Sequence, residues 1–99
     1  MFVHEDIIKL CTKLELIARP EGFHVGWTGS TLYGQGSNND LDLIVYPHKS
    51  YKKTKMQGEL CIRDMFKGQK VESLADKEYQ RQVYRTHING IQIDILYLE

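Results

Sequence analysis

The stretch that decides the fold reads Asp40-Leu41-Asp42-Leu43-Ile44-Val45-Tyr46. Its side chains alternate between polar and apolar, which is typical of a strand with one buried face. Leu41, Leu43 and Val45 then face the core, and Asp40 and Asp42 share the opposite face. Two carboxylates at this spacing repel each other unless a cation lies between them. The stretch therefore predicts a strand and, on its polar face, oxygen ligands of the kind that suits Mg²⁺ or Mn²⁺.

A helix is predicted ahead of this strand, over about residues 4–19. Its apolar residues recur at steps of three and four, which places them in one stripe: Ile7, Leu10, Cys11, Leu14, Ile17 and Ala18. Pro20 and Gly22 end the helix. Residues 23–28 then alternate loosely and predict a short strand that runs directly into Gly29-Ser30.

The part of the chain after the strand divides into a loop, a helix and a hairpin. Pro47 ends the strand, and apolar residues from Met56 to Phe66 predict a second helix of about three turns. Residues 67–79 are polar and predict a loop or a short helical turn. Asn89-Gly90, flanked by alternating apolar residues, is the preferred pair for a two-residue hairpin turn.

The hairpin turn also sets a register. It pairs Ile88 with Ile91 and, counting back, Arg85 with Asp94. One face of the hairpin is then apolar, and the other carries Arg85, His87, Gln92 and Asp94. Asp94 therefore points away from the predicted core, as Asp40 and Asp42 do. We expect three carboxylates along one side of one sheet.

The fold class that follows is α+β in a single domain over residues 1–99. We expect a small mixed sheet of about four strands, with two helices covering its apolar face and the carboxylate face open. The expected order is helix, strand, short helical turn, strand, helix, hairpin. A composition of 41% hydrophobic and 26% charged residues is ordinary for a folded domain of this kind.

Charge and hydropathy narrow the classes of function. Thirteen basic and thirteen acidic residues cancel, so the whole molecule has no long-range attraction for nucleic acid or anionic membrane. No apolar run is long enough to span a membrane, and the N-terminus lacks the layout of a signal peptide. We therefore expect a cytoplasmic protein without a membrane partner. Cys11 and Cys61 are expected to be buried free thiols.

Gly29-Ser30 completes a second functional feature. It follows a predicted strand, where a helical turn would direct free backbone N–H groups and the Ser30 hydroxyl toward an anion. A phosphate cradle beside a carboxylate metal site is what phosphoryl transfer needs, because that chemistry depends on positioning and charge neutralisation.

These residues together resemble a known family. The run Gly29-Ser30-Thr31-Leu32-Tyr33-Gly34, followed by Asn39-Asp40-Leu41-Asp42-Leu43-Ile44-Val45, is similar to the signature of the DNA polymerase beta-like nucleotidyltransferase superfamily, especially its minimal bacterial and phage-type members. In that family a Gly-Ser pair precedes Asp-x-Asp, and a third carboxylate follows on a later strand. The similarity covers about residues 23–47, with Asp94 in the third position.

The resemblance implies a nucleotidyltransferase-like fold and an enzyme that moves a nucleoside monophosphate from an NTP, such as ATP, to a hydroxyl acceptor. Gly29 and Ser30 would bind the nucleotide phosphates. Asp40, Asp42 and Asp94 would be the catalytic and metal-binding carboxylates, with Asp94 helping to activate the acceptor hydroxyl. The sequence departs from the family at Tyr33, where many minimal members have Arg, and at Asn39, where Ser is common. Arg85 opposite Asp94 is a further concern, because an ion pair would occupy this carboxylate.

Two alternatives stay open. The first is a binding partner like the small nucleotidyltransferase-fold antitoxins, which pair with a helical toxin; the short chain would then obtain its other contacts from a partner protein. The second is a nucleic-acid binding module that uses the lysine-rich segment Lys49–Lys55. The acceptor of an active enzyme would be RNA, a small molecule such as an aminoglycoside, or a protein side chain.

Overall fold

The structure is a computed structural model, and it describes residues 4–28, 40–49, 52–76 and 81–98. These ranges contain five strands, two helices and one 3₁₀ turn. In chain order they are α1 (His4–Ala18), the 3₁₀ turn η1 (Arg19–Glu21), β1 (Phe23–Thr28), β2 (Asp40–Pro47), α2 (Lys55–Met65), β3 (Glu72–Asp76), β4 (Arg81–Ile88) and β5 (Ile91–Tyr97). Both predicted helices, the first two strands and the hairpin are confirmed. The predicted helical turn after Ser30 lies outside the described residues.

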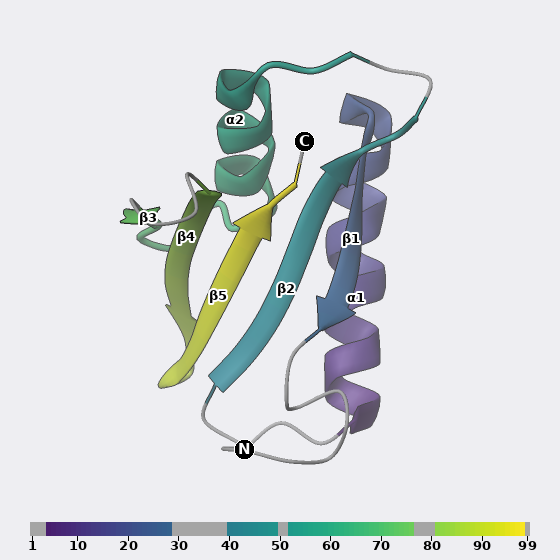
Figure 1. The fold of residues 1–99 in the computed structure, drawn as a ribbon. Helices are drawn as coiled ribbons and strands as arrows, with labels where there is room; N and C mark the ends of the chain where they lie inside the picture. Colours follow the sequence, from purple (N-terminus) through teal and green to yellow (C-terminus); the bar gives the residue numbers. More distant parts are fainter. Residues whose placement is uncertain (1–3, 29–39, 50–51, 77–80, 99) are drawn as a thin grey trace.

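All five strands form one sheet in the order β1-β2-β5-β4-β3. β2 and β5 are parallel, and the other neighbours are antiparallel, so the sheet is mixed as predicted. Figure 1 shows β2 and β5 side by side at the centre of the sheet. The hairpin register is also confirmed, because Ile88 pairs with Ile91 and Arg85 with Asp94.

The fifth strand, β3, was not predicted. Residues 72–76 lie in a segment for which we expected a loop or a short helical turn, but they pair with the outer edge of β4. On its core-facing side β3 places Ser73, which is exposed, so the segment carries little of the apolar signal by which strands are recognised. Its backbone pairing with β4 makes it a strand.

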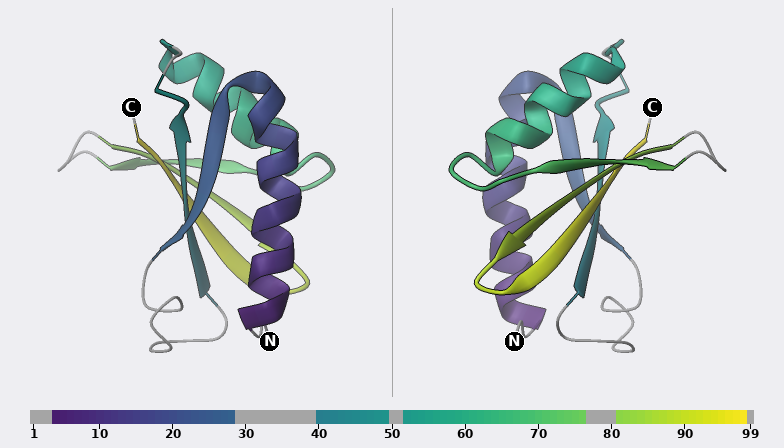
Figure 2. Two further views of the ribbon diagram at one scale, coloured as in Figure 1. Left: turned by 90° about the vertical axis from the view of Figure 1, so that its right-hand side faces the viewer. Right: turned by 90° about the vertical axis from the view of Figure 1, so that its left-hand side faces the viewer.

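Both helices cover the same face of the sheet (Figure 2). The side chains that point toward them are buried: Leu41, Leu43 and Val45 on β2, and Ile93 and Ile95 on β5, are each at most 1% exposed. They pack in one cluster with buried residues of α1 and α2. The predicted apolar and polar faces of the sheet are therefore confirmed, and neither of the two described helices lies on the second face.

Local signals explain where the helices begin and end. Gly22 follows η1 with φ of 87°, a left-handed conformation that glycine adopts without strain, and its N–H donates to the carbonyl of Arg19. Thr54 precedes α2 and exchanges hydrogen bonds with Gln57 in a capping box. Neither described helix is both long and apolar enough to cross a membrane.

Cys11 and Cys61 are both free, as predicted. Cys61 is buried and Cys11 is half-buried. Burial, together with the nearby Glu21 carboxylate, raises the pKa of the Cys61 thiol to about 12. This side chain is therefore a packing residue and not a nucleophile.

Gly58 brings α2 close to the sheet. A Cβ atom at this position would lie 2.5 Å from two ring carbons of Tyr97 on β5. The glycine that weakens the helix locally is therefore the residue that allows the Tyr97 ring to lie against the helix backbone.

Glu15 ties α1 to the edge strand β1. Its Oε1 accepts a hydrogen bond from the Val25 backbone N–H at 2.9 Å, and its Oε2 lies 2.9 Å from Nδ1 of His24. Arg19 donates to the same Oε2 at 3.1 Å. Burial alone would raise the pKa of this carboxyl, but the hydrogen bonds from Val25, His24 and Arg19 outweigh it and leave the pKa lowered.

Replacing Gly58 by Ala is expected to destabilise the protein. In an ordinary helix this change stabilises by about 0.5–1 kcal/mol, but the overlap with Tyr97 should cost about 1–3 kcal/mol and reverse the sign. Urea unfolding measures the difference. Met56→Ala, in the same helix turn but 69% exposed, is the control and should stay within about 0.5 kcal/mol of the wild type. A Gly58→Ala protein more stable than the wild type would contradict this account of the contact.

Glu15→Gln is expected to lower the free energy of unfolding at pH 7 by about 1–2 kcal/mol, because charged hydrogen bonds become neutral. The folded-state pKa of Glu15 is lowered, so its stabilisation is complete above the ordinary value of 4.5 and is lost as the pH falls through the lowered value. Urea unfolding between pH 7 and pH 3 should show a smaller pH-dependent loss in the variant. Equal losses in both proteins would refute the assignment.

Candidate active site

A row of polar side chains crosses the sheet on the face opposite to α1 and α2. Residues paired across neighbouring strands project to the same face, so the strand registers define the row. We call it the charged row, and it consists of Thr28, Asp42, Asp94, Arg85 and Glu72.

Asp42 and Asp94 lie side by side at the centre of the charged row. They are Cα partners on the parallel strands β2 and β5, which neighbouring-strand geometry places about 4.8 Å apart. Both side chains are half-buried, and each is flanked along its strand by core residues that are at most 1% exposed. The buried neighbours fix both carboxylates on the open face, so two negative charges are held close together.

Asp40 begins β2, two residues before Asp42, and pairs with Gln92. Its place in the strand puts it on the same face as Asp42; only its backbone is described. Gly29 and Ser30 lie outside the described residues. Thr28, the residue before Gly29, is the Cα partner of Asp42, so the described end of β1 lies directly beside this carboxylate.

Arg85 holds the carboxylate of Asp94. Its Nε donates to Oδ1 at 2.7 Å and its NH2 group to Oδ2 at 3.2 Å, while the Gln92 amide lies 3.4 Å from Oδ2. The Asp94 and Arg85 side chains are 26% and 35% exposed. The cross-strand ion pair expected from the hairpin register therefore forms, and the guanidinium supplies one positive charge beside two carboxylates.

An apolar row, which the sequence pattern did not predict, runs alongside the charged row on the same face. The register places Gly26 beside Ile44, then Leu96, Val83 and Leu74, and all five residues are half-buried. The available signal was the uninterrupted run Leu43-Ile44-Val45, which shows that β2 is apolar on both faces over this stretch.

The lysine-rich segment lies at the other end of β2. Asp42 and Pro47 are separated along this strand by about 16 Å, at roughly 3.3 Å per residue, and Lys49 follows beyond Pro47. Lys53 lies over the Phe23 ring, 5.5 Å from its centroid, at the start of β1. In the described part of the chain, this segment is therefore remote from the charged row.

The donor set fits a hard divalent cation. Asp42 and Asp94 offer only oxygen ligands, and Asp40 starts the same strand, which is the chemistry that Mg²⁺ and Mn²⁺ prefer. Among the described side chains, which do not include that of Asp40, no three metal-ligating groups converge. In the described structure, the Arg85 guanidinium binds the carboxylate of Asp94.

No known family model matches the sequence, and no curated protein matches it either. Solved structures do match. The poly(U) polymerase Cid1 with bound magnesium and 3′-dATP superimposes with a TM-score of 0.71 at 16% identity, over 94% of this chain and 30% of Cid1. The polymerase core of the RNA surveillance complex TRAMP gives 0.69 at 14% identity, over 100% and 33%.

Terminal uridylyl transferase 4 from Trypanosoma brucei, with bound UPU, gives a TM-score of 0.56 at 19% identity, over 94% of this chain and 34% of that one. The chain thus spans about a third of the length of the structures that it matches. By its tertiary structure, this chain has the nucleotidyltransferase fold that the Gly29-Ser30 and Asp40-x-Asp42 motifs predicted.

Proposed function

We propose that this chain is a metal-dependent nucleotidyltransferase that moves a nucleoside monophosphate from an NTP to a hydroxyl acceptor. The observation that carries the proposal is the pairing of Asp42 with Asp94 on adjacent parallel strands, on the open face of the sheet. The fold shared with poly(U) polymerase Cid1 supports it.

The chemistry follows from where charge must be neutralised. Nucleotidyl transfer requires an acceptor oxygen to attack the α-phosphorus while pyrophosphate leaves, and the protein contributes mainly by positioning and by electrostatics. Mg²⁺, held by Asp40, Asp42 and Asp94, would neutralise the phosphate oxygens. Asp94 would accept the proton of the acceptor hydroxyl at a carboxylate oxygen, and this requires that its ion pair with Arg85 loosens.

In this proposal, Gly29 and Ser30 bind the phosphates of the nucleotide. Support comes from Thr28, which precedes them and is the Cα partner of Asp42, so that a phosphate held just after β1 would lie next to the carboxylates. The acceptor is one of the three classes named above. The matched structures include an RNA terminal U-transferase, so an RNA hydroxyl is the first acceptor to test.

A second candidate is a binding partner that acts mainly through a protein complex, as nucleotidyltransferase-fold antitoxins do. The observation that favours it is the ion pair itself: both oxygens of Asp94 accept hydrogen bonds from Arg85. If that pair is permanent, the third carboxylate is neutralised and the fold serves as a scaffold.

The proposed function predicts magnesium-dependent binding of an NTP. Calorimetric titration of each NTP with Mg²⁺ should show binding to the wild type, and Asp42→Asn or Asp40→Asn should weaken it by about 100-fold through loss of a cation ligand. Asp6→Asn, which removes an exposed aspartate of α1, is the matched control and should bind like the wild type. Absence of NTP binding by the wild type, or full binding by Asp42→Asn, would overturn the proposal.

Arg85→Gln separates the two candidates. If Arg85 is a displaceable counter-ion, removing it should tighten Mn²⁺ binding by about tenfold and lower the stability of the metal-free protein by about 1 kcal/mol. Calorimetry and urea unfolding with and without Mn²⁺ measure both effects. Lys52→Gln removes a positive charge at the other end of β2 and should leave Mn²⁺ affinity unchanged. Equally weak Mn²⁺ binding in wild type and Arg85→Gln would favour the binding partner.

A further inference from the structure

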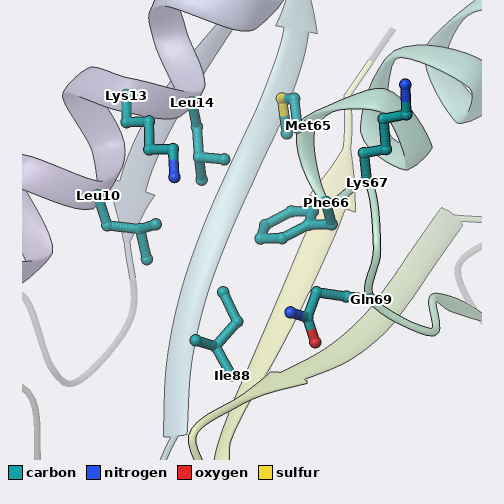
Figure 3. A pocket seen from close by; sticks show the side chains of 8 residues that line it. All are labelled: Leu10, Lys13, Leu14, Met65, Phe66, Lys67, Gln69 and Ile88. Carbon is teal, nitrogen blue, oxygen red and sulfur yellow. The ribbon is translucent and has the colours of Figure 1, made fainter.

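A small cavity opens on the helix-covered side of the sheet, on the face opposite to the charged row. It lies where α1, the end of α2 and the end of β4 approach one another (Figure 3). Leu10, Leu14, Phe66 and Ile88 form much of its apolar lining, and Lys13, Lys67 and Gln69 stand around them. The cavity volume is about 100 Å³.

The cavity is a place where the two helices leave apolar side chains of the core partly uncovered. Along α1, Ile7 and Leu14 are 0% and 1% exposed, but Leu10 between them is only half-buried. Along β4, Tyr84 and Thr86 are each 1% exposed, whereas Ile88 on the same face is half-buried. Apolar surface that the two helices bury elsewhere is thus left open at this point.

The size of the cavity limits what it can hold. Pockets for nucleotides and other ligands of that size measure about 300–1,000 Å³, and a cavity of about 150 Å³ accepts benzene. A volume of about 100 Å³ therefore suits one branched aliphatic side chain and excludes a nucleotide.

The lysines that line the cavity indicate what kind of segment would carry that side chain, and they differ from other lysines of the chain. Lys9 and Lys70 each pair with a carboxylate, Glu5 at 3.4 Å and Glu72 at 3.7 Å. Lys13 and Lys67, which border the cavity, are exposed and make no ion pair with any described residue. Figure 3 shows Lys13 and the Gln69 carboxamide turned toward the gap, whereas the Lys67 amine is turned away from it, at the edge of the rim. An incoming segment with acidic residues would complement this rim.

We propose that this cavity is a docking site for a partner protein, which inserts one leucine-like side chain from an acidic segment. The apolar lining would bury the side chain, the two lysines would contact flanking carboxylates, and the Gln69 carboxamide would hydrogen-bond the segment's backbone. The site is on the opposite face of the sheet from the charged row, so it does not depend on the proposed transferase activity.

The test uses the full chain with labelled methyl groups and a short peptide that carries one leucine among aspartates and glutamates. Titration should shift the NMR signals of Leu10, Leu14 and Ile88. Lys13→Glu combined with Lys67→Glu should weaken binding about tenfold, whereas the matched control, Lys9→Glu combined with Lys70→Glu, should weaken it less than about threefold. All four positions are exposed, so both double variants are expected to fold.

Three outcomes would overturn the proposal: no methyl shifts at millimolar peptide, equal affinity for a peptide with alanine in place of leucine, or the same shifts with an RNA oligonucleotide. The first outcome would mean that the cavity is only a packing defect of the core. The second shows that charge alone attracts the peptide, and the third assigns the rim to phosphate. Peptide binding by Asp42→Asn should match the wild type, which separates this result from failure of the proposed transferase function.

Discussion

The parallel pairing of β2 with β5 is the contact on which both faces of the sheet depend. On the helix side it places Leu41, Leu43 and Val45 of β2 beside the buried residues of β5, and on the open side it places Asp42 beside Asp94. A slip of one residue in either strand would turn its carboxylate into the core and its core residues outward. Burying an unpaired carboxylate costs free energy, and this cost disfavours the slipped registers that would disrupt the candidate site.

The charged row is an arrangement of like charges that the core holds together. Two half-buried carboxylates on adjacent strands repel each other, and the fold tolerates them because the strands beneath are fixed by fully buried neighbours. Arg85 relieves part of the repulsion through its ion pair with Asp94. The same guanidinium that stabilises the row would compete with a metal ion for that carboxylate, so the proposed metal binding would be coupled to stability at one side chain.

The two faces of the sheet carry different chemistry because α1 and α2 both cover the same one. α1 and α2 bury much of the apolar face and leave a small gap near Ile88, while the other face carries charged and apolar rows side by side. A partner docked at the gap would leave the charged row accessible. The chain spans about a third of the length of the matched structures.

The sequence by itself determined those parts of the structure that depend on the side chains of a single segment. The stripe of α1, the alternation of Asp40 to Tyr46 and the Asn89-Gly90 turn are properties of single segments, and the turn alone predicted that Arg85 meets Asp94. The roles of Gly29, Ser30, Asp40, Asp42 and Asp94 stay predictions. Only the tertiary structure decided that β2 adjoins β5, that residues 72–76 form an edge strand, that Gly58 meets Tyr97, and where the apolar row and the cavity lie. These features join segments that are distant in the chain. Which segments meet depends on packing across the whole core, and the local periodicity of side chains does not encode that packing.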